Sequence, residues 1–224
     1  MTGVLVVAKA PVPGQVKTRL GAAVGEGAAA VLAAAALLDT IDVCERTFGA
    51  RSCTLALSGD LGSAEEGDQI GDRLAAWTVF PQRGQDFATR LEHAHRVAFE
   101  HLERPVVQVG MDTPQMTTEH LHRLSGRLDQ YDAVLAPAHD GGWWALGVTD
   151  PCWLRGLGGV PMSTDATGDL TRRHLLGNGA QVALGDTLRD IDYAADADQV
   201  SGEAPTTRFA RAWLALPQHD GVAA

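Results

Sequence analysis

The stretch that decides the fold is PVVQVGMDTPQM, residues 105–116. Val106–Val109 form a short valine-rich run between breakers, which predicts a buried strand. Gly110 ends that strand, and Asp112 follows it directly. In an open α/β sheet, ligands bind at the carboxyl ends of the strands. Asp112 is therefore either a ligand for a divalent metal beside a substrate phosphate, or an aspartate that caps a turn before the next helix.

Strands and helices are expected to alternate on both sides of this stretch. The expected strands are Gly3–Ala8, Cys53–Ser58, Trp77–Phe80, Ala133–Ala136, Trp143–Val148 and Val182–Leu184. The expected helices are Gly25–Thr47, Asp86–Glu103, Thr118–Leu128, Asp165–Leu176 and Pro205–Leu216, and Gly59–Asp72 is expected to be a surface loop. Such alternation predicts a parallel or mixed sheet between two helical layers, an α/β/α fold. We expect residues 1–224 to form one domain.

Composition narrows the class of protein. A net charge of −10 argues against a nucleic-acid surface, which needs a basic stripe. The three cysteines form no zinc pattern and fit a reducing compartment, so we expect a cytoplasmic protein. The apolar run Ala28–Leu38 is too short to span a bilayer and predicts a buried helix, with no membrane partner.

The loop after the first strand concentrates positive charge. Lys9 and Lys17 are the only lysines among 18 lysines and arginines, and both lie in this loop together with Arg19. A lysine suits a polyphosphate as a flexible point charge, and an arginine adds a planar fork. The loop lacks the Walker pattern, so it is either a phosphate site of another kind or a solvated surface loop stiffened by prolines.

Two later segments also follow strands. His139–Trp144 reads HDGGWW, and its two glycines would let the backbone approach a ligand, or simply form a hairpin turn. Asp190 and Asp192 flank Ile191, and in an extended segment only one of the two carboxylates would face a site. A turn that leads into a helix at Ala194 would explain the same residues.

Four motifs together resemble the DUF2064 family, which is similar to nucleotidyltransferases of the MobA and CofC kind. They are AKAPVPGQVKTRL (8–20), VGMDTPQMT (109–117), APAHDGGWWALG (136–147) and LRDIDYAAD (188–196). The resemblance spans nearly the whole chain and implies a GT-A-type nucleotide-diphospho-sugar transferase fold. Three departures stand out: Phe87-Ala88 replaces Leu-Gly, His139 replaces an acid, and Trp143-Trp144 replaces a tyrosine pair.

The resemblance also implies site residues. Lys17 and Asp112 are the expected catalytic residues, and Asp112 and Asp192 the expected ligands of Mg²⁺ or Mn²⁺, with Asp190 mainly structural. The nucleotide is expected at Lys9, Pro13, Gly14, Lys17, Thr18, Arg19, Gly84, Asp86 and Arg90. The second substrate is expected at His139, Asp140, Gly141, Gly142, Ser163 and Thr164.

Three functions remain open at this point. The first is nucleotidyl transfer from a nucleoside triphosphate to a small acceptor that bears a phosphate or phosphonate, with release of pyrophosphate. The second is glycosyl transfer from a nucleotide-diphospho-sugar, and the third is nucleotide binding without catalysis. Two observations favour nucleotidyl transfer. Two lysines and an arginine in the first loop suit the high charge of a triphosphate. Gly110-Met111-Asp112 carries a single acid, whereas metal-dependent glycosyltransferases usually have the paired acids of a D-x-D motif.

Overall fold

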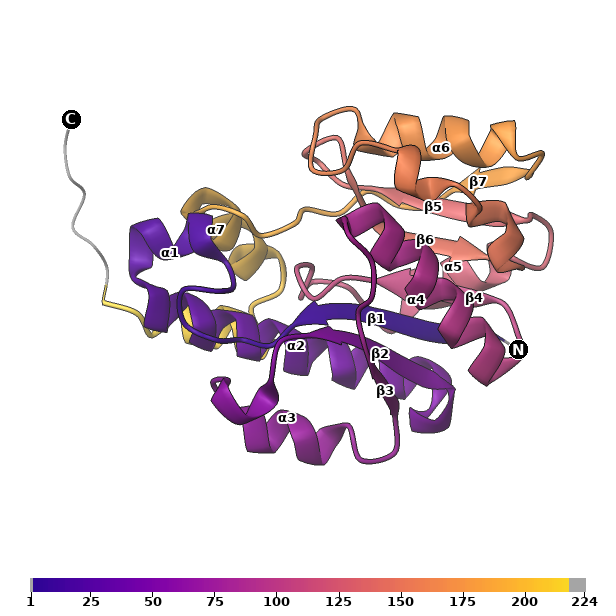
Figure 1. Cartoon of the computed structure of the whole chain (residues 1–224). Coiled ribbons are helices and arrows are strands. Elements are labelled where there is room, and N and C mark those ends of the chain that lie inside the picture. The colour runs from indigo at the N-terminus through magenta and orange to yellow at the C-terminus, as the bar shows by residue number, and fades with distance from the viewer. Residues whose placement is uncertain (1, 218–224) are drawn as a thin grey trace.

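A computed structural model describes residues 2–217 of the chain. Its described residues form a seven-stranded sheet in the order β3-β2-β1-β4-β6-β5-β7 (Figure 1). The strands are β1 (Gly3–Lys9), β2 (Cys53–Ser58), β3 (Thr78–Pro81), β4 (Val106–Val109), β5 (Ala133–Pro137), β6 (Trp143–Val148) and β7 (Val182–Leu184). Only β6 runs antiparallel to its neighbours β4 and β5. The expected mixed, mostly parallel sheet is confirmed.

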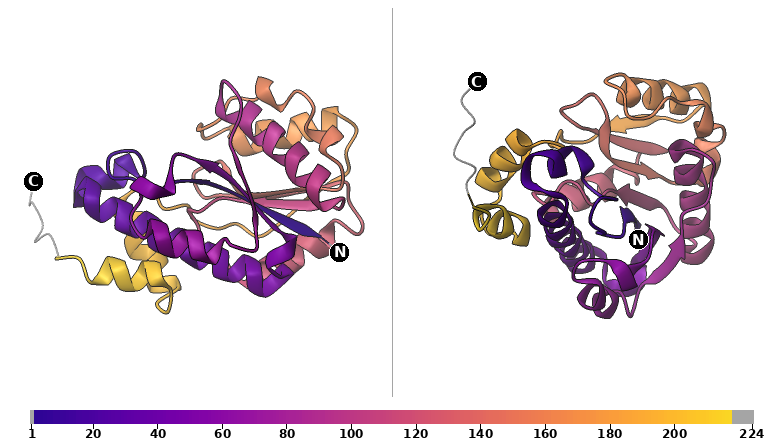
Figure 2. Two further views of the ribbon diagram at one scale, coloured as in Figure 1. Left: turned by 60° about the horizontal axis from the view of Figure 1, so that its bottom comes forward. Right: turned by 60° about the vertical axis from the view of Figure 1, so that its left-hand side comes forward.

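Helices cover both faces of the sheet (Figure 2). They are α1 (Thr18–Val24), α2 (Glu26–Phe48), α3 (Gly67–Arg73), α4 (Phe87–Leu102), α5 (Thr118–Arg127), α6 (Thr167–Gly177), α7 (Ala194–Glu203) and α8 (Arg208–Leu214). Buried residues of α2, α3 and α5 pack in one core cluster, and those of α4 and α6 pack in another. The three-layer architecture predicted from the alternation is therefore confirmed.

Helix α2 is an alanine-rich core helix. By length and composition it could cross a membrane, but 78% of its most apolar window is buried inside the protein. It also anchors the end of the described chain, because the Asp39 carboxylate accepts hydrogen bonds from the backbone N–H groups of Arg208 and Phe209 at 3.0 and 2.9 Å. The segment before α7 lies against the end of β4, where the Ile191 N–H donates to the Asp112 carbonyl at 3.0 Å.

Two segments differ from the prediction. The end of the expected loop after the first strand, residues 18–21 with Arg19, forms the start of helix α1. The expected loop Gly59–Asp72 contains helix α3. Its polar sequence hides a single fully buried apolar side chain, Ile70, which enters the core. Arg73 then pairs with Asp42 and Glu45 of α2 at 2.5 and 2.6 Å, so one apolar anchor and two ion pairs fix a helix that periodicity does not reveal.

Candidate functional site

Two adjoining cavities open at the carboxyl ends of β1 and β4. Because these strands are parallel, with Val6 beside Val109, their following loops leave the same edge of the sheet. The larger cavity, of about 520 Å³, is lined by six aspartates and is called the acidic cavity: Asp112, Asp140, Asp165, Asp190, Asp192 and Asp196. The smaller, of about 240 Å³, is called the basic cavity and is lined by Lys9, Lys17, Arg19 and Arg90. Asp112, Asp192 and Arg19 line both.

Lys17 and Asp112 form the junction of the two cavities. The Lys17 ammonium lies 2.6 Å from Oδ1 of Asp112 and also donates to the Ile191 carbonyl. Its side chain is only 4% exposed, whereas that of Asp112 is 46% exposed. Lys17 adopts left-handed backbone angles, with φ of 50°, directly before α1. That turn directs the chain into the helix and the ammonium toward the end of β4.

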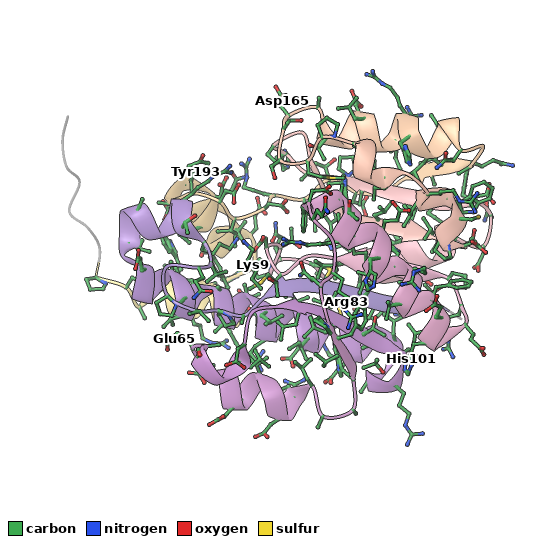
Figure 3. The ribbon with its side chains drawn as sticks, viewed as in Figure 1. Lys9, Glu65, Arg83, His101, Asp165 and Tyr193 are labelled. Carbon is green, nitrogen blue, oxygen red and sulfur yellow. The ribbon has the colours of Figure 1, made fainter. Side chains whose placement is uncertain are left out.

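Arg19 and Asp192 form a second, more exposed pair beside the first. Arg19 Nη1 lies 2.7 Å from Asp192 Oδ2, and its guanidinium carbon lies 5.8 Å from the centre of the Tyr193 ring. In Figure 3, Lys9 lies at the end of β1 and Tyr193 at the start of α7, whereas Asp165 lies farther off on the loop before α6. The first loop, the strand-end aspartate and the late DID segment are thus brought together as predicted.

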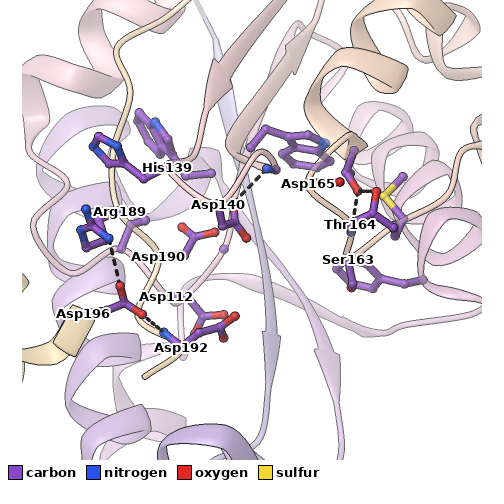
Figure 4. Close-up of a pocket in the computed structure, with 18 of the residues that line it drawn as sticks. Asp112, His139, Asp140, Ser163, Thr164, Asp165, Arg189, Asp190, Asp192 and Asp196 are labelled. Atoms are coloured by element: carbon purple, nitrogen blue, oxygen red, sulfur yellow. Dashed lines mark hydrogen bonds and ion pairs between the residues drawn. The ribbon is translucent and has the colours of Figure 1, made fainter. Parts of the chain in front are cut away.

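Asp190 and Asp192 both line the acidic cavity, so the expectation that only one of them faces the site does not hold. Residues 189–192 are not part of a strand, and the strict alternation of a strand therefore does not apply. Burial, followed by the negative charges of Asp112 and Asp140, raises the pKa of Asp190 to about 8. Figure 4 shows these aspartates grouped on one side of the cavity and Ser163–Asp165 on the other.

The glycine pair after His139 has a packing role. A Cβ atom on Gly141, whose φ is +87°, would lie 2.0 Å from the Asp165 carbonyl oxygen. The Gly168 N–H donates to the Gly141 carbonyl at 2.8 Å, so this loop is locked to the start of α6. Gly141 does not line the cavity, although His139, Asp140, Gly142, Ser163 and Thr164 do. The close approach expected for a ligand is made here by the protein's own backbone.

The loop between β3 and α4 shapes the basic cavity. Asp86 caps α4 by accepting from the Thr89 N–H at 2.7 Å, and this hydrogen bond lowers its pKa. A Cβ atom on Gly84 would lie 2.7 Å from the backbone nitrogen of Arg90, so the loop packs tightly on helix α4. Arg90 and Thr18 line the basic cavity, whereas Pro13, Gly14, Gly84 and Asp86 line neither cavity.

Several lining residues were not predicted from the sequence. Gln108, in the middle of β4, lines the acidic cavity together with Phe87, Trp143, Met162 and Tyr193. The signal for Gln108 was present, because it is one polar residue in a four-residue strand that is otherwise valine. Phe87 was noted only as a departure from the family pattern, yet it lines both cavities.

Carboxylate oxygens are the ligands that hard divalent cations such as Mg²⁺ prefer, so the aspartates of the acidic cavity are chemically suited to bind one. Burial is the main cause of the raised pKa of Asp190, and repulsion from Asp112 and Asp140 adds to it; a nearby cation would offset that repulsion. Within residues 2–217, no three histidine, cysteine or acidic side chains converge closely enough to hold a metal alone. A cation here would therefore share its coordination with phosphate oxygens and water.

The fold is that of nucleotide-diphospho-sugar transferases and cytidylyltransferases. The chain belongs to the DUF2064 family, described as an uncharacterized protein conserved in bacteria, whose family model matches residues 40–164. A search of curated proteins finds no match.

Solved structures show the same architecture. A protein provisionally named a nucleotide-diphospho-sugar transferase, from Desulfovibrio desulfuricans G20, is 25% identical, with a TM-score of 0.79 over 95% of this chain and 92% of that one. A cytidylyltransferase from Leptospira borgpetersenii is 11% identical, with a TM-score of 0.57 over 94% and 91%. Rv0371c from Mycobacterium tuberculosis H37Rv, solved in complex with manganese, is 16% identical, with a TM-score of 0.51 over 89% and 98%.

Proposed function

We propose that this protein transfers a nucleotidyl group from a nucleoside triphosphate to a small acceptor that bears a phosphate or phosphonate. The observation that carries the proposal is the Lys17–Asp112 ion pair, because its aspartate lines both the basic and the acidic cavity. The basic cavity suits the triphosphate, which leaves the acidic cavity for the second substrate, whose phosphate would lie beside the cation proposed at Asp112. The two substrates then meet at Asp112.

In the proposed reaction an acceptor phosphate oxygen attacks the α-phosphorus of the triphosphate. The bond from the α-phosphorus to the oxygen that bridges to the β-phosphorus breaks, and pyrophosphate leaves with that oxygen and its electron pair. Lys17 and Arg19 bind phosphate oxygens and offset the charge that grows on the leaving group. Lys9 and Arg90 line the same cavity and add charge along the phosphate chain.

A divalent cation, Mg²⁺ or Mn²⁺, is part of the proposal. Asp112 and Asp192 would hold it, because both line the two cavities and carry hard oxygen ligands. When bound, the cation supplies positive charge that neutralises the phosphates. The manganese complex of Rv0371c, which shares the fold, supports this choice of metal. Lys17 and Arg19, which pair with the two aspartates here, would then turn to the nucleotide phosphates.

Glycosyl transfer from a nucleotide-diphospho-sugar is the second candidate, favoured by the provisional name of the Desulfovibrio protein. The two reactions release different products, so one assay separates them. The purified protein is incubated with each nucleoside triphosphate or each UDP- and GDP-sugar, with Mg²⁺ or Mn²⁺, and with a panel of phosphate-bearing acceptors. Pyrophosphate together with a nucleotidylated acceptor supports the proposal, and a nucleoside diphosphate identifies glycosyl transfer. Nucleotide binding without either product would indicate a non-catalytic nucleotide-binding protein.

A further inference from the structure

One wall of the acidic cavity is uncharged and holds a buried amide. Gln108 lines the cavity and is 2% exposed, and within the described residues its Oε1 atom has no hydrogen-bond partner. His95 of α4 lies beside it, fully buried, and neither ring nitrogen has a well-formed hydrogen bond in that part of the chain. Each buried polar group left without a partner costs about 1–3 kcal/mol, so this arrangement is destabilising unless something completes it.

Apolar side chains surround this amide on the same wall. We use the name uncharged wall for Val7, Gln108, Trp143 and Met162, which all line the acidic cavity. Val7, Trp143 and Met162 belong to the core cluster that packs α4 on the sheet. The Trp143 indole N–H donates to Thr171 Oγ1 at 3.2 Å, which fixes the plane of the ring. The wall therefore offers a flat, immobile surface with one hydrogen-bonding group in it.

The charges of the acidic cavity exclude an anion at this wall. Its two arginines are both paired, Arg19 with Asp192 at 2.7 Å and Arg189 with Asp196 at 3.0 Å. Six aspartates line the rest of the cavity. An anionic group placed against Gln108 would meet repulsion from these carboxylates, whereas an uncharged group can exchange hydrogen bonds with the amide.

We propose that Gln108 is a specificity-determining residue for the second substrate, whose body carries an uncharged planar group with an adjacent hydrogen-bond donor and acceptor. This inference rests on the proposed function for the identity of the cavity's occupant. The phosphate of that substrate would lie at Asp112 and its planar body against the uncharged wall. Gln108 touches the substrate, and the buried ring of His95 lies beside its amide.

Two ring compounds of equal size test this assignment directly. Benzamide carries an uncharged amide and benzoate an anionic carboxylate on the same ring. The full-length protein is labelled with ¹⁵N at its five tryptophan indoles, and each compound is titrated while the Trp143 signal, assigned with Trp143→Phe, is followed. Benzamide is expected to bind wild type with a dissociation constant of about 1 mM, and benzoate about tenfold or more weakly.

Matched variants test whether benzamide binding depends on the Gln108 amide. Gln108→Leu, and Gln108→Met as a second isostere, should weaken benzamide about tenfold, leave nucleoside triphosphate affinity unchanged, and keep the melting temperature at or above that of wild type. Gln115→Leu is the control: this second buried glutamine lies outside both cavities and donates to the Arg189 carbonyl at 2.7 Å, so its loss should lower the melting temperature and spare benzamide binding.

Three results would overturn the assignment: no shift of the Trp143 signal with either compound, benzoate binding as well as benzamide, or undiminished benzamide binding by both Gln108 variants. These outcomes leave the proposed reaction untouched, because they do not depend on turnover. The reverse result is also informative. If benzamide binds through Gln108 but no acceptor is nucleotidylated, the assignment of the pocket stands and the proposed nucleotidyl transfer is wrong.

Discussion

The Lys17 ammonium lies 2.6 Å from Oδ1 of Asp112, with the lysine side chain 4% exposed and the aspartate side chain 46% exposed. The Lys17 ammonium is therefore held inside the protein, and the Asp112 carboxylate faces the cavities. Removing the lysine leaves Asp112 and the neighbouring aspartates with less positive charge to balance them. A nucleotide that brings further negative charge should bind this altered site poorly.

Lys17→Ala should weaken nucleoside triphosphate binding by about 2 kcal/mol, the range of a hydrogen bond to a charged group. Lys9→Ala is the matched control, because Lys9 lines the same cavity but is exposed at the end of β1 and should matter less. Isothermal titration calorimetry of the three proteins measures this. Equal affinity of wild type and Lys17→Ala would remove Lys17 from the phosphate site.

Substitutions of Asp192 and Asp190 should differ in their effect on kcat. Asp192 pairs with Arg19 and lines both cavities, whereas Asp190 lines only the acidic one. Asp192→Asn should lower kcat by about tenfold or more with little change in nucleotide affinity, because a second ligand fixes the position of the cation. Asp190→Asn, of the same size, should change kcat far less. A larger rate loss from Asp190→Asn would mean that the two roles are exchanged.

His95 should make the protein sensitive to acid. Burial lowers the pKa of His95 from 6.5 to about 4. The unfolded chain therefore binds a proton between those pH values and the folded protein does not, so stability falls as the pH drops from 6.5 toward 4. A shift of this size corresponds to roughly 3 kcal/mol of unfolding free energy.

His95→Leu should flatten that acid-side loss, and His122→Leu, at an exposed position on α5, should not. Urea unfolding of wild type and both variants at several pH values between 4 and 8 measures the difference. If wild type and His95→Leu lose stability in parallel below pH 6.5, then His95 titrates normally.

Gly141 should not tolerate a side chain. Its φ is +87°, and an added Cβ atom would lie 2.0 Å from the Asp165 carbonyl oxygen, so Gly141→Ala must displace the loop that carries His139 and Asp140. We expect a loss of about 1–3 kcal/mol of stability, from strain alone. Gly126→Ala in α5, where an added Cβ meets nothing within 4 Å, should be neutral or stabilising. Thermal unfolding compares the two, and equal melting temperatures would show that the loop moves freely.

The sequence predicted most of the fold because its strands are short apolar runs between strong breakers. Val106–Val109 and Cys53–Ser58 have the predicted bounds, and helix α4 begins directly after Asp86, the expected start of that helix. Helix α3 was not predicted because Ile70 is its only buried apolar side chain, and one such residue makes no periodic pattern. Helix α1 was not predicted either, because only Leu20 and Gly21 of its seven residues are buried.

The site was predictable in its outline. Lys17, Asp112 and Asp192 follow strands or precede helices, and parallel pairing gathers such ends at one edge. The sequence did not predict two relations between distant segments. One is the close packing of Gly141 against Asp165, and the other is that Asp190 and Asp192 line the same cavity. Both depend on how loops pack, and loop packing leaves no local signal.

Pyrophosphate release by wild type and Asp112→Asn, each assayed with a nucleoside triphosphate, Mg²⁺ and the phosphate-bearing acceptor panel, tests the central claim most directly. Asp112 joins the two cavities, so wild type should release pyrophosphate only when an acceptor is present. Excess EDTA should stop it, and Asp112→Asn should lose nearly all turnover while melting at the wild-type temperature. Full turnover by Asp112→Asn, or by wild type in excess EDTA, would contradict the account.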